Sequence, residues 1–357
     1  MPHTGLRRRA PVARVSVTQG SSLTRTVWQA CEHGRVDLAY ERLADRMHVV
    51  SLPLVTRFRG VDVREVALFS GAAGWGEWSP FLEYGSEEAA RWLRAALEDA
   101  DLERPAAVRD RIPVNATLPA VAPDAVAGVL ARYDGCRTVK VKVAERGQTL
   151  ADDVARVAEV RALLPESRIR VDANGGWNID EAEHAVRALE RFDLEYVEQP
   201  CATVPELAEL RTRLHRLAIP IAADESVRKA EDPLLVARAG AADVLVVKAQ
   251  PLGGVRAALA IVAEAGLPAV VSSALDSSVG LSMGAALAGA LPELPFDCGL
   301  GTGALLAADV AAPLVPVGGS IPVTRVVPLE ALLTANAASP ERIDAWRARL
   351  AACLPHL

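Results

Sequence analysis

The sequence is poor in several kinds of residue, and each shortage excludes a class of protein. Its 357 residues include only five cysteines and six histidines, and no two cysteines form a CxxC pair. This pattern argues against a disulfide framework, a zinc finger and a histidine-rich metal site, and it indicates a reduced, cytoplasmic protein. No apolar run reaches the roughly 18 residues that a membrane span requires. Acidic residues outnumber basic ones by 45 to 39, which disfavours nucleic acid as a partner.

The remaining composition is that of an ordinary globular protein, with 51% hydrophobic and 24% charged residues. The first part of the chain, residues 1–35, is basic and lacks periodicity, and we expect it to carry no function. Arg7, Arg8 and Arg9 resemble a twin-arginine signal, but no apolar segment follows them. A disordered tail and a translation start at Val36 are the two other interpretations, and we favour the later start.

Short β-branched runs alternate with helical stretches from residue 112 to about residue 303. Such alternation indicates βα units and a parallel sheet. Eight nearly continuous apolar runs favour a closed barrel over a doubly wound sheet, which would need a Gly-rich fingerprint after its first strand. The predicted strands are 112–117, 138–143, 168–172, 194–198, 219–223, 243–248, 268–273 and 296–300. The predicted helices between them are 151–164, 181–192, 204–217, 232–240, 254–266 and 279–291.

The segments on either side of this repeat have a different pattern. Residues 36–110 hold three strand-like pieces followed by a helix, and residues 305–357 hold a strand and two helices. Both are too small for independent domains, so we expect them to pack together as a cap over the barrel mouth. The predicted fold is therefore a modified TIM-type (β/α)7β barrel at residues 111–304 with an α+β capping domain formed by the two flanks.

Polar residues follow one predicted strand after another, at the end where the active site of such a barrel lies. A single strand-end lysine is usually solvated, and a single strand-end carboxylate is often a helix cap. Independent caps and solvated residues have no reason to follow the order Lys, Asp, Glu, Asp, Lys at barrel spacing, so we expect one site. Its predicted members are Lys140, Lys142, Asp172, Asn174, Glu198, Asp224, Glu225 and Lys248.

The three carboxylates of this set, Asp172, Glu198 and Asp224, are hard oxygen ligands without a histidine or cysteine among them. Such a set suits Mg²⁺, with Mn²⁺ as a substitute, and leaves coordination positions for water and substrate. The lysines on both flanks of the carboxylates would act on a substrate held by the metal. The sequence thus predicts a small-molecule substrate, neither nucleic acid nor membrane as partner, and no particular oligomeric state.

The motifs KxK, DxN, EQP, DES and a final lysine resemble those of the enolase superfamily and, within it, of the muconate-lactonising subgroup. The resemblance covers roughly residues 36–357. Within the subgroup the chain is most similar to the o-succinylbenzoate synthases of the actinobacterial type. The segments that carry this similarity are RFRG at 57–60, GWGEWSPF at 74–81 and SSALDSSVG at 272–280.

This resemblance implies a Mg²⁺-dependent syn-dehydration in menaquinone biosynthesis, from 2-succinyl-6-hydroxy-2,4-cyclohexadiene-1-carboxylate to 2-succinylbenzoate. It implies that Asp172, Glu198 and Asp224 hold the metal. Lys142 would remove the proton α to the ring carboxylate and return it to the departing hydroxide. Lys248 would stabilise the enediolate from the opposite side. The implied supporting residues are Lys140, Asn174 and Glu225.

Two departures separate the chain from neighbouring families. No histidine lies at a predicted strand end, unlike in a mandelate-racemase-like site, and the eighth strand lacks the acidic DxD of a dipeptide epimerase. That strand instead continues into CGLGTG at 298–303, whose glycines would offer backbone N–H groups to a substrate carboxylate. The candidate substrate-binding residues are Arg57, Arg59, Ser273, Gly299 and Gly301.

Three other functions stay open. An N-acylamino acid racemase would use two lysines on opposite faces to exchange one α-proton in both directions. A lactone-forming cycloisomerase fits less well. A barrel that binds an anion without turnover fits least, because every expected lysine and carboxylate is present.

Overall fold

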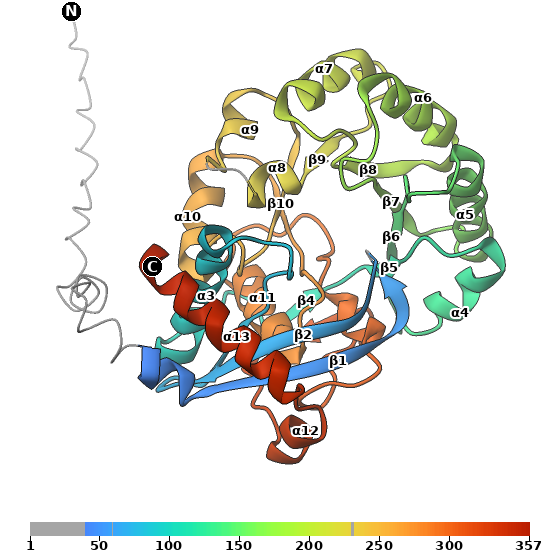
Figure 1. Cartoon of the computed structure of the whole chain (residues 1–357). Coiled ribbons are helices and arrows are strands. Elements are labelled where there is room, and N and C mark those ends of the chain that lie inside the picture. The colour runs from blue at the N-terminus through green and yellow to red at the C-terminus, as the bar shows by residue number, and fades with distance from the viewer. Residues whose placement is uncertain (1–39, 59, 230–231) are drawn as a thin grey trace, which may run out of the picture.

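The computed structural model describes residues 40–58, 60–229 and 232–357. The described chain consists of a ring of parallel strands with helices around it, and of an antiparallel sheet with helices packed against it (Figure 1). The predictions for residues 1–35 and for Arg59 lie outside the described residues. None of the helices in the described ranges has the length and apolar character needed to cross a membrane.

Seven parallel strands, paired in chain order, make up most of the ring. Residues 298 and 299 close it, because Cys298 forms a parallel bridge with Val114 and Gly299 forms one with Ser272. The predicted eighth strand is therefore reduced to these bridges, since the chain turns into a 3₁₀ helix at Gly301. The strands are β5 (Ala116–Leu118), β6 (Thr138–Lys142), β7 (Arg168–Asp172), β8 (Leu194–Glu198), β9 (Ile221–Ala223), β10 (Val244–Val247) and β11 (Ala269–Val271).

The single strand predicted at 112–117 is wrong, because the chain changes partners in its middle. β4 (Arg111–Pro113) pairs antiparallel with β12 (Ser320–Pro322), whereas β5 joins the barrel. At the switch, the N–H of Val114 donates to the Gly319 carbonyl at 2.9 Å, and the N–H of Asn115 donates to the Cys298 carbonyl at 2.9 Å.

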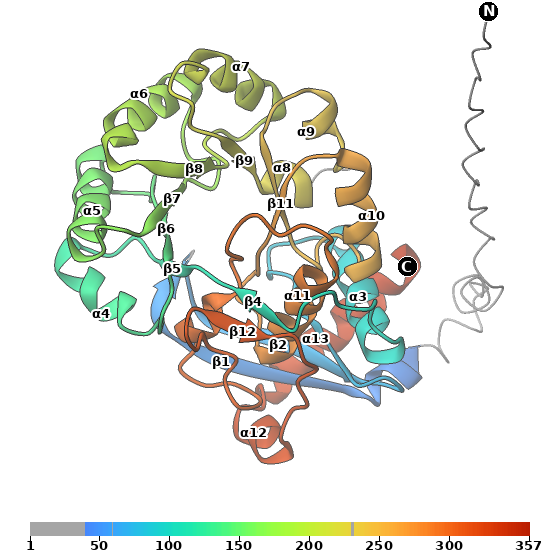
Figure 2. The same ribbon diagram turned by 180° about the vertical axis from the view of Figure 1, so that it is seen from behind.

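Helices cover the outside of the ring (Figure 2). Three of them begin with a capping box, at Thr149, Asn178 and Thr203, in which the cap residue and an acidic residue three positions later bond each other's backbone. The helix predicted at 232–240 is shortened to one turn, because a proline restricts its start and Gly240 ends it at a φ of 57°. The barrel helices are α4 (Val126–Leu130), α5 (Leu150–Leu163), α6 (Ile179–Leu189), α7 (Val204–Leu214), α8 (Glu225–Arg228), α9 (Leu235–Arg238), α10 (Val255–Ala265) and α11 (Ser278–Ala290).

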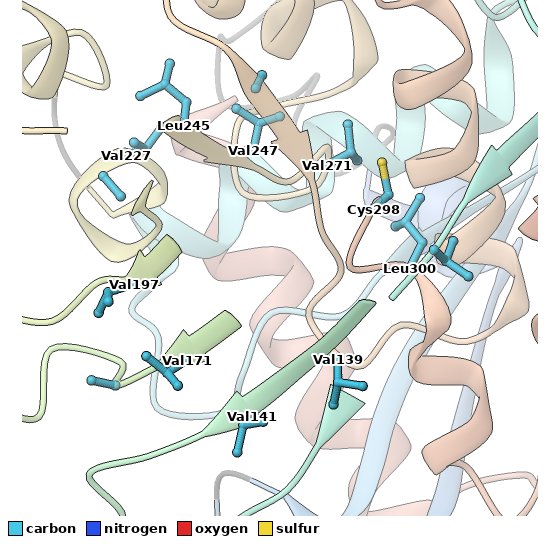
Figure 3. Packing of buried hydrophobic residues seen from close by; sticks show 14 of the residues in the cluster. Val139, Val141, Val171, Val197, Val227, Leu245, Val247, Val271, Cys298 and Leu300 are labelled. Carbon is cyan, nitrogen blue, oxygen red and sulfur yellow. The ribbon is translucent and has the colours of Figure 1, made fainter. Parts of the chain in front are cut away.

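The side chains of the barrel strands alternate between two apolar layers. One set packs outward beneath the helices (Figure 3), including Val139, Val141, Val171, Val197 and Val247. The other set fills the inside of the ring with Tyr196, Ala222, Val244, Val246 and Val270. Because side chains repeat every two residues along a strand, positions two residues beyond the inner layer also face inward, at the carboxyl ends of the strands. The fold therefore gathers the polar strand-end residues at one rim of the ring.

The cap is built from both ends of the described chain. A three-stranded antiparallel sheet, in the order β1-β2-β3, packs against helices from each flank. Trp78 of the sheet meets Trp346 of the last helix edge to face, with ring centroids 5.1 Å apart. The cap elements are β1 (Met47–Phe58), β2 (Val61–Ser70), β3 (Trp75–Trp78), α3 (Ser86–Asp101), α12 (Glu330–Ala335) and α13 (Pro340–Cys353).

Helix α11 joins the cap to the barrel. It is apolar all round, and its residues from Ser278 to Gly289 are buried. It contacts β3 of the cap on one side and β11 of the barrel on the other. The helix therefore belongs to the packing of both parts.

Candidate active site

A pocket lies at the carboxyl ends of the barrel strands, and the cap covers part of it. It brings together most of the residues predicted from the strand ends, although Glu198 and Glu225 are not among its lining residues. Phe58 and Phe81 reach it from the cap. The barrel residues that line it are Thr117, Lys140, Lys142, Asp172, Asn174, Asp224, Lys248, Ser272, Ser273, Ala274, Leu275, Gly299 and Thr302.

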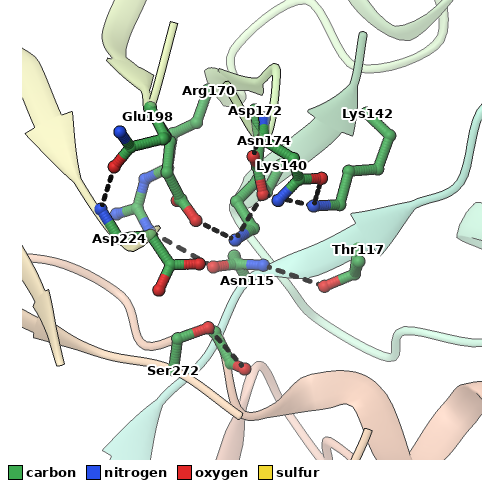
Figure 4. A network of polar contacts seen from close by, with 12 residues as sticks. Asn115, Thr117, Lys140, Lys142, Arg170, Asp172, Asn174, Glu198, Asp224 and Ser272 are labelled. Carbon is green, nitrogen blue, oxygen red and sulfur yellow. Dashed lines mark hydrogen bonds and ion pairs between the residues drawn. The ribbon is translucent and has the colours of Figure 1, made fainter. Parts of the chain in front are cut away.

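The two lysines of β6 face the pocket side by side, and both contact the carboxylate of Asp172 (Figure 4). Lys140 Nζ lies 2.7 Å from Glu198 Oε1 and 3.2 Å from Asp172 Oδ2. Lys142 donates to Asp172 and, at 2.6 Å, to Asn174 Oδ1. Burial would lower the pKa of Lys140, but the carboxylates of Glu198 and Asp172 outweigh it and raise that pKa above its ordinary value.

Lys248 stands across the ring from these lysines. It follows β10 directly, and in a closed ring of eight positions β10 lies four positions from β6 in either direction. Its Nζ lies 2.5 Å from Asp224 Oδ2. Burial lowers the pKa of Lys248, and the Asp224 carboxylate opposes this effect. The site therefore has buried amines on both sides, two from β6 and one after β10, as the strand order predicts.

The three carboxylates between the lysines differ in charge environment. Burial, reinforced by Asp172, raises the pKa of Glu198 to about 7. Burial acts on Asp172 in the same direction, but the Lys142 and Lys140 ammoniums hold its pKa well below the usual range. Lys248 and Arg228 likewise hold the pKa of Asp224 low against the effect of burial. Glu198 is thus the carboxylate with the least compensating positive charge.

A divalent metal ion fits the donor chemistry of these carboxylates. Within the described ranges no three His, Cys, Asp or Glu side chains are grouped as a metal cluster, and Asp172 and Asp224 are each ion-paired with a lysine. Yet Glu198 Oε2 is buried and has no hydrogen-bond partner among the described residues. A buried carboxylate oxygen without a partner is costly unless a cation approaches it. Asp172, Glu198 and Asp224 are therefore the residues that would hold such an ion.

Asn174 and Glu225 support the site from its edge. The backbone N–H of Asn174 donates to Asp172 Oδ1 at 3.0 Å, and its side-chain Nδ2 donates to Glu225 Oε1 at 3.2 Å. Glu225 begins α8, and Asp224 occupies the cap position before it. The Asp224 side chain nevertheless makes no capping hydrogen bond. The ordinary explanation of a strand-end aspartate as a helix cap therefore does not apply to Asp224.

The candidate substrate-binding residues have different positions. Ser273 and Gly299 line the pocket, whereas Gly301 is buried outside its lining. The N–H of Gly299 donates to the Val271 carbonyl at 2.8 Å, so the prediction that it receives a substrate carboxylate is wrong. Its missing side chain has a packing reason, because a Cβ would lie 2.4 Å from Ser272 Oγ. Arg57 lies outside the pocket with its side chain 68% exposed, 3.5 Å from Asp62.

Two family models match the chain, one over each part of the fold. Residues 124–327 match the model described as enolase C-terminal domain-like, and residues 49–100 match the one described as enolase N-terminal domain-like. The chain belongs to the enolase superfamily. The predicted family and the predicted barrel with its cap are confirmed, and enzymes of this superfamily generally use a divalent metal ion.

Individual members of the superfamily match over most of their length. An o-succinylbenzoate synthase of Thermobifida fusca is 60% identical over 304 residues, which are 85% of this chain and 94% of the relative. One of Mycobacterium marinum is 57% identical over 316 residues, 88% of this chain and 95% of the relative. The solved muconate lactonizing enzyme of Pseudomonas putida has a TM-score of 0.69 at 21% identity and covers 82% of this chain and 98% of its own, which supports the fold.

Several residues of this superfamily site were not predicted from the sequence. Phe58, Phe81 and Leu275 form apolar lining, and Lys142 Nζ lies 5.3 Å from the centre of the Phe58 ring. Phenylalanine is rare in this chain, and two of its five phenylalanines line the pocket. This rarity is a sequence feature that could have indicated Phe58 and Phe81. Arg228, behind Asp224, had no such signal among the many arginines of the chain.

Proposed function

We propose that the chain catalyses the Mg²⁺-dependent syn-dehydration of 2-succinyl-6-hydroxy-2,4-cyclohexadiene-1-carboxylate to 2-succinylbenzoate. It would thus be a carbon–oxygen lyase of menaquinone biosynthesis, acting in the cytoplasm. The observation that carries this proposal is the 57% and 60% identity to o-succinylbenzoate synthases over nearly their whole length. The order of lysines and carboxylates around the pocket supplies groups suited to this reaction.

The metal site of the proposed enzyme consists of Asp172, Glu198 and Asp224. When bound, Mg²⁺ supplies positive charge that holds the ring carboxylate and favours loss of the neighbouring proton. Lys140 keeps Glu198 and Asp172 in place through contacts of 2.7 and 3.2 Å. Its role is therefore to orient the metal ligands.

Lys142 carries the proton in this proposal. As a neutral amine it takes the proton from the ring carbon that bears the carboxylate. The same nitrogen then gives this proton to the hydroxyl oxygen on the adjacent carbon as that C–O bond breaks. Water leaves, and the six-membered ring becomes aromatic. Lys142 suits both steps because Asn174 holds it at the pocket wall, whereas Lys140 is turned toward Glu198.

Lys248 acts from the opposite wall without transferring a proton. Its ammonium lies in a buried position, where charge interacts more strongly than in water. Asp224, 2.5 Å away, favours the charged form of this lysine. Lys248 therefore stabilises the negative charge that develops on the substrate carboxylate.

The test is incubation of the purified chain with the cyclohexadiene substrate and Mg²⁺, and separately with N-succinyl amino acids. We expect aromatic product from the first substrate, detected by its ultraviolet absorbance, and loss of this activity when EDTA removes the metal. The opposed lysines also suit a racemase, so faster α-proton exchange of N-succinyl amino acids than dehydration would favour that function. Binding of the cyclohexadiene substrate without turnover, together with no α-proton exchange of the N-succinyl amino acids, would contradict both enzymatic functions.

A further inference from the structure

A chain of polar contacts leads from Lys142 away from the pocket and ends in the cap. Lys142 Nζ donates to Asn174 Oδ1 at 2.6 Å, and Asn174 Nδ2 donates to Glu225 Oε1 at 3.2 Å. Arg228 Nη2 donates to the same Glu225 oxygen at 2.6 Å. Arg228 Nη1 donates to the hydroxyl of Tyr84 at 2.9 Å. The chain thus connects the lysine of β6 with a tyrosine of the cap.

Arg228 is the charged centre of this chain. Only 2% of its surface is exposed, and it also approaches Asp224 Oδ1 with its Nε at 3.2 Å. It is placed there by α8, since Glu225 and Arg228 lie one helical turn apart. A buried guanidinium is costly unless good partners surround it, and here two carboxylates and one hydroxyl do so. Arg228 does not line the pocket, so it acts through its partners.

The direction of the hydrogen bonds shows what this arrangement does to Asn174. An asparagine amide has one donor end and one acceptor end, and either end can face a neighbour. The carboxylate of Glu225 accepts a hydrogen bond and so attracts the NH₂ end, which leaves Oδ1 for the Lys142 amine. Glu225 is itself held by Arg228, and Arg228 by Tyr84.

We propose that Arg228 is a positioning residue for Lys142 and acts through Glu225 and Asn174. This inference rests on the proposed function, in which Lys142 carries the proton. Tyr84 anchors the arginine from the cap, so correct seating of the cap contributes to the position of the lysine. Loss of the guanidinium would remove its 2.6 Å contact with Glu225 Oε1, weaken the orientation of the Asn174 amide, and widen the range of positions that Lys142 occupies.

The first test compares Arg228→Met with the native chain in steady-state kinetics. We expect kcat to fall about tenfold or more while KM changes by less than about threefold, because misplacing a reacting group costs rate rather than binding. Arg228→Lys keeps the charge but lacks the second arm, so it should recover part of kcat. Tyr84→Phe should give a smaller fall in kcat. These two variants decide the question if Arg228→Met does not fold.

The second test does not depend on catalysis. Trace acetylation of the metal-free protein, followed by peptide mass spectrometry, gives the rate at Lys142 relative to Lys140, which is on the same strand and similarly buried. The chain contains only four lysines, so the peptides are easily assigned. We expect the Lys142 to Lys140 ratio to rise several-fold in Arg228→Met.

Arg104→Met is the matched control, because Arg104 is also largely buried and ion-paired, 2.7 Å from Asp99, but lies outside the pocket. It should lower Tm and leave both kcat and the acetylation ratio native. A native kcat and a native ratio in all three variants of Arg228 and Tyr84 would overturn the inference, as would equal changes in Arg104→Met. Absence of dehydration by the native chain would instead overturn the proposed function, and the acetylation ratio would still test Arg228.

Discussion

At the scale of single residues, the buried positive and negative charges of the pocket nearly balance. Lys140 is paired with Glu198, Lys142 with Asp172, and Lys248 with Asp224. A divalent ion added to three lysines and three carboxylates leaves two positive charges in excess. Such a pocket favours an anionic substrate, because a buried excess charge is costly until an opposite charge enters.

Glu198 is the residue on which the metal site is most directly tested. Glu198→Gln should weaken Mg²⁺ binding by about 100-fold or more. This loss exceeds the one expected for a residue that only orients a metal ligand. The chain should still fold, because the apolar layers of the barrel are unchanged and Lys140 keeps its contact with Asp172. Isothermal titration calorimetry measures the affinity, with the exposed Glu264→Gln as control. Unchanged Mg²⁺ binding in Glu198→Gln would contradict the ligand role.

Lys248 tests the electrostatic part of the mechanism. Lys248→Ala should raise the barrier by about 3–4 kcal/mol, the cost of losing one group that stabilises developing negative charge. Lys248→Arg should recover part of this loss, because it restores the charge but not the geometry. The measurement is kcat/KM for dehydration of the cyclohexadiene substrate. A near-native rate in Lys248→Ala would remove this lysine from the mechanism.

The strand-end residues were predictable because the barrel rule places them from the chain order alone. The lining from the cap was not, because the position of Phe58 depends on how the cap sits on the barrel rather than on any local period. The role of the Gly299 N–H was predicted wrongly for a similar reason. Its availability depends on pairing with Val271, which is distant in sequence.

At the scale of secondary-structure elements, β3 and the start of α11 meet at a buried acidic pair, Glu77 and Asp276. Glu77 of β3 accepts hydrogen bonds from the backbone N–H groups of Gly280 at 2.9 Å and Ser277 at 3.1 Å, so a cap strand holds the start of a helix that also packs on the barrel. Burial, together with the nearby Asp276, raises the pKa of Glu77 to about 7, and burial raises the pKa of Asp276 to about 6. Arg64 is the cation that opposes both shifts.

This buried acidic pair predicts how the stability of the protein depends on pH. The folded-state pKa of Glu77 exceeds its ordinary value of 4.5, so the folded state binds more protons, and stability is lost as the pH rises from about 5 through 7. Glu77→Gln has no such titration. Its free energy of unfolding relative to native should therefore rise by roughly 3 kcal/mol between pH 5 and pH 8. Urea unfolding at both pH values measures this, with exposed Glu87→Gln as control; a pH-independent difference for Glu77→Gln would contradict it.

The elements also show where local patterns stop being informative. Strands β6, β7 and β8 lie within the predicted runs. β6 and β7 keep one alternation from end to end, whereas the pairing of β8 with β7 shifts register between Leu194 and Tyr196. The run at 112–117 has the same alternation but divides where its backbone partner changes, and no local pattern records that change. The helix predicted at 232–240 was overestimated because Ala and Leu favour a helix that the flanking proline and glycine restrict.

At the scale of the whole molecule, α11 makes the cap and the barrel depend on each other. Its apolar surface is buried by both parts, so separating them would expose it to water. We expect one unfolding transition. Tryptophan fluorescence reports mainly on the cap, through Trp75, Trp78, Trp92 and Trp346, whereas far-ultraviolet circular dichroism reports mainly on the barrel helices. The two probes should give the same urea midpoint; two separated midpoints would show independent units.

The central claim is that one lysine performs both proton transfers, and Lys142→Ala tests it most directly. The measurement follows dehydration of the cyclohexadiene substrate and, in ²H₂O, deuterium exchange at its α-carbon. A syn-elimination uses one face only, so Lys142→Ala should lose dehydration and exchange together, whereas Lys248→Ala should keep both at a reduced rate. A racemase would instead keep exchange from the remaining face in each variant. Dehydration by Lys142→Ala at a near-native rate would contradict the mechanism.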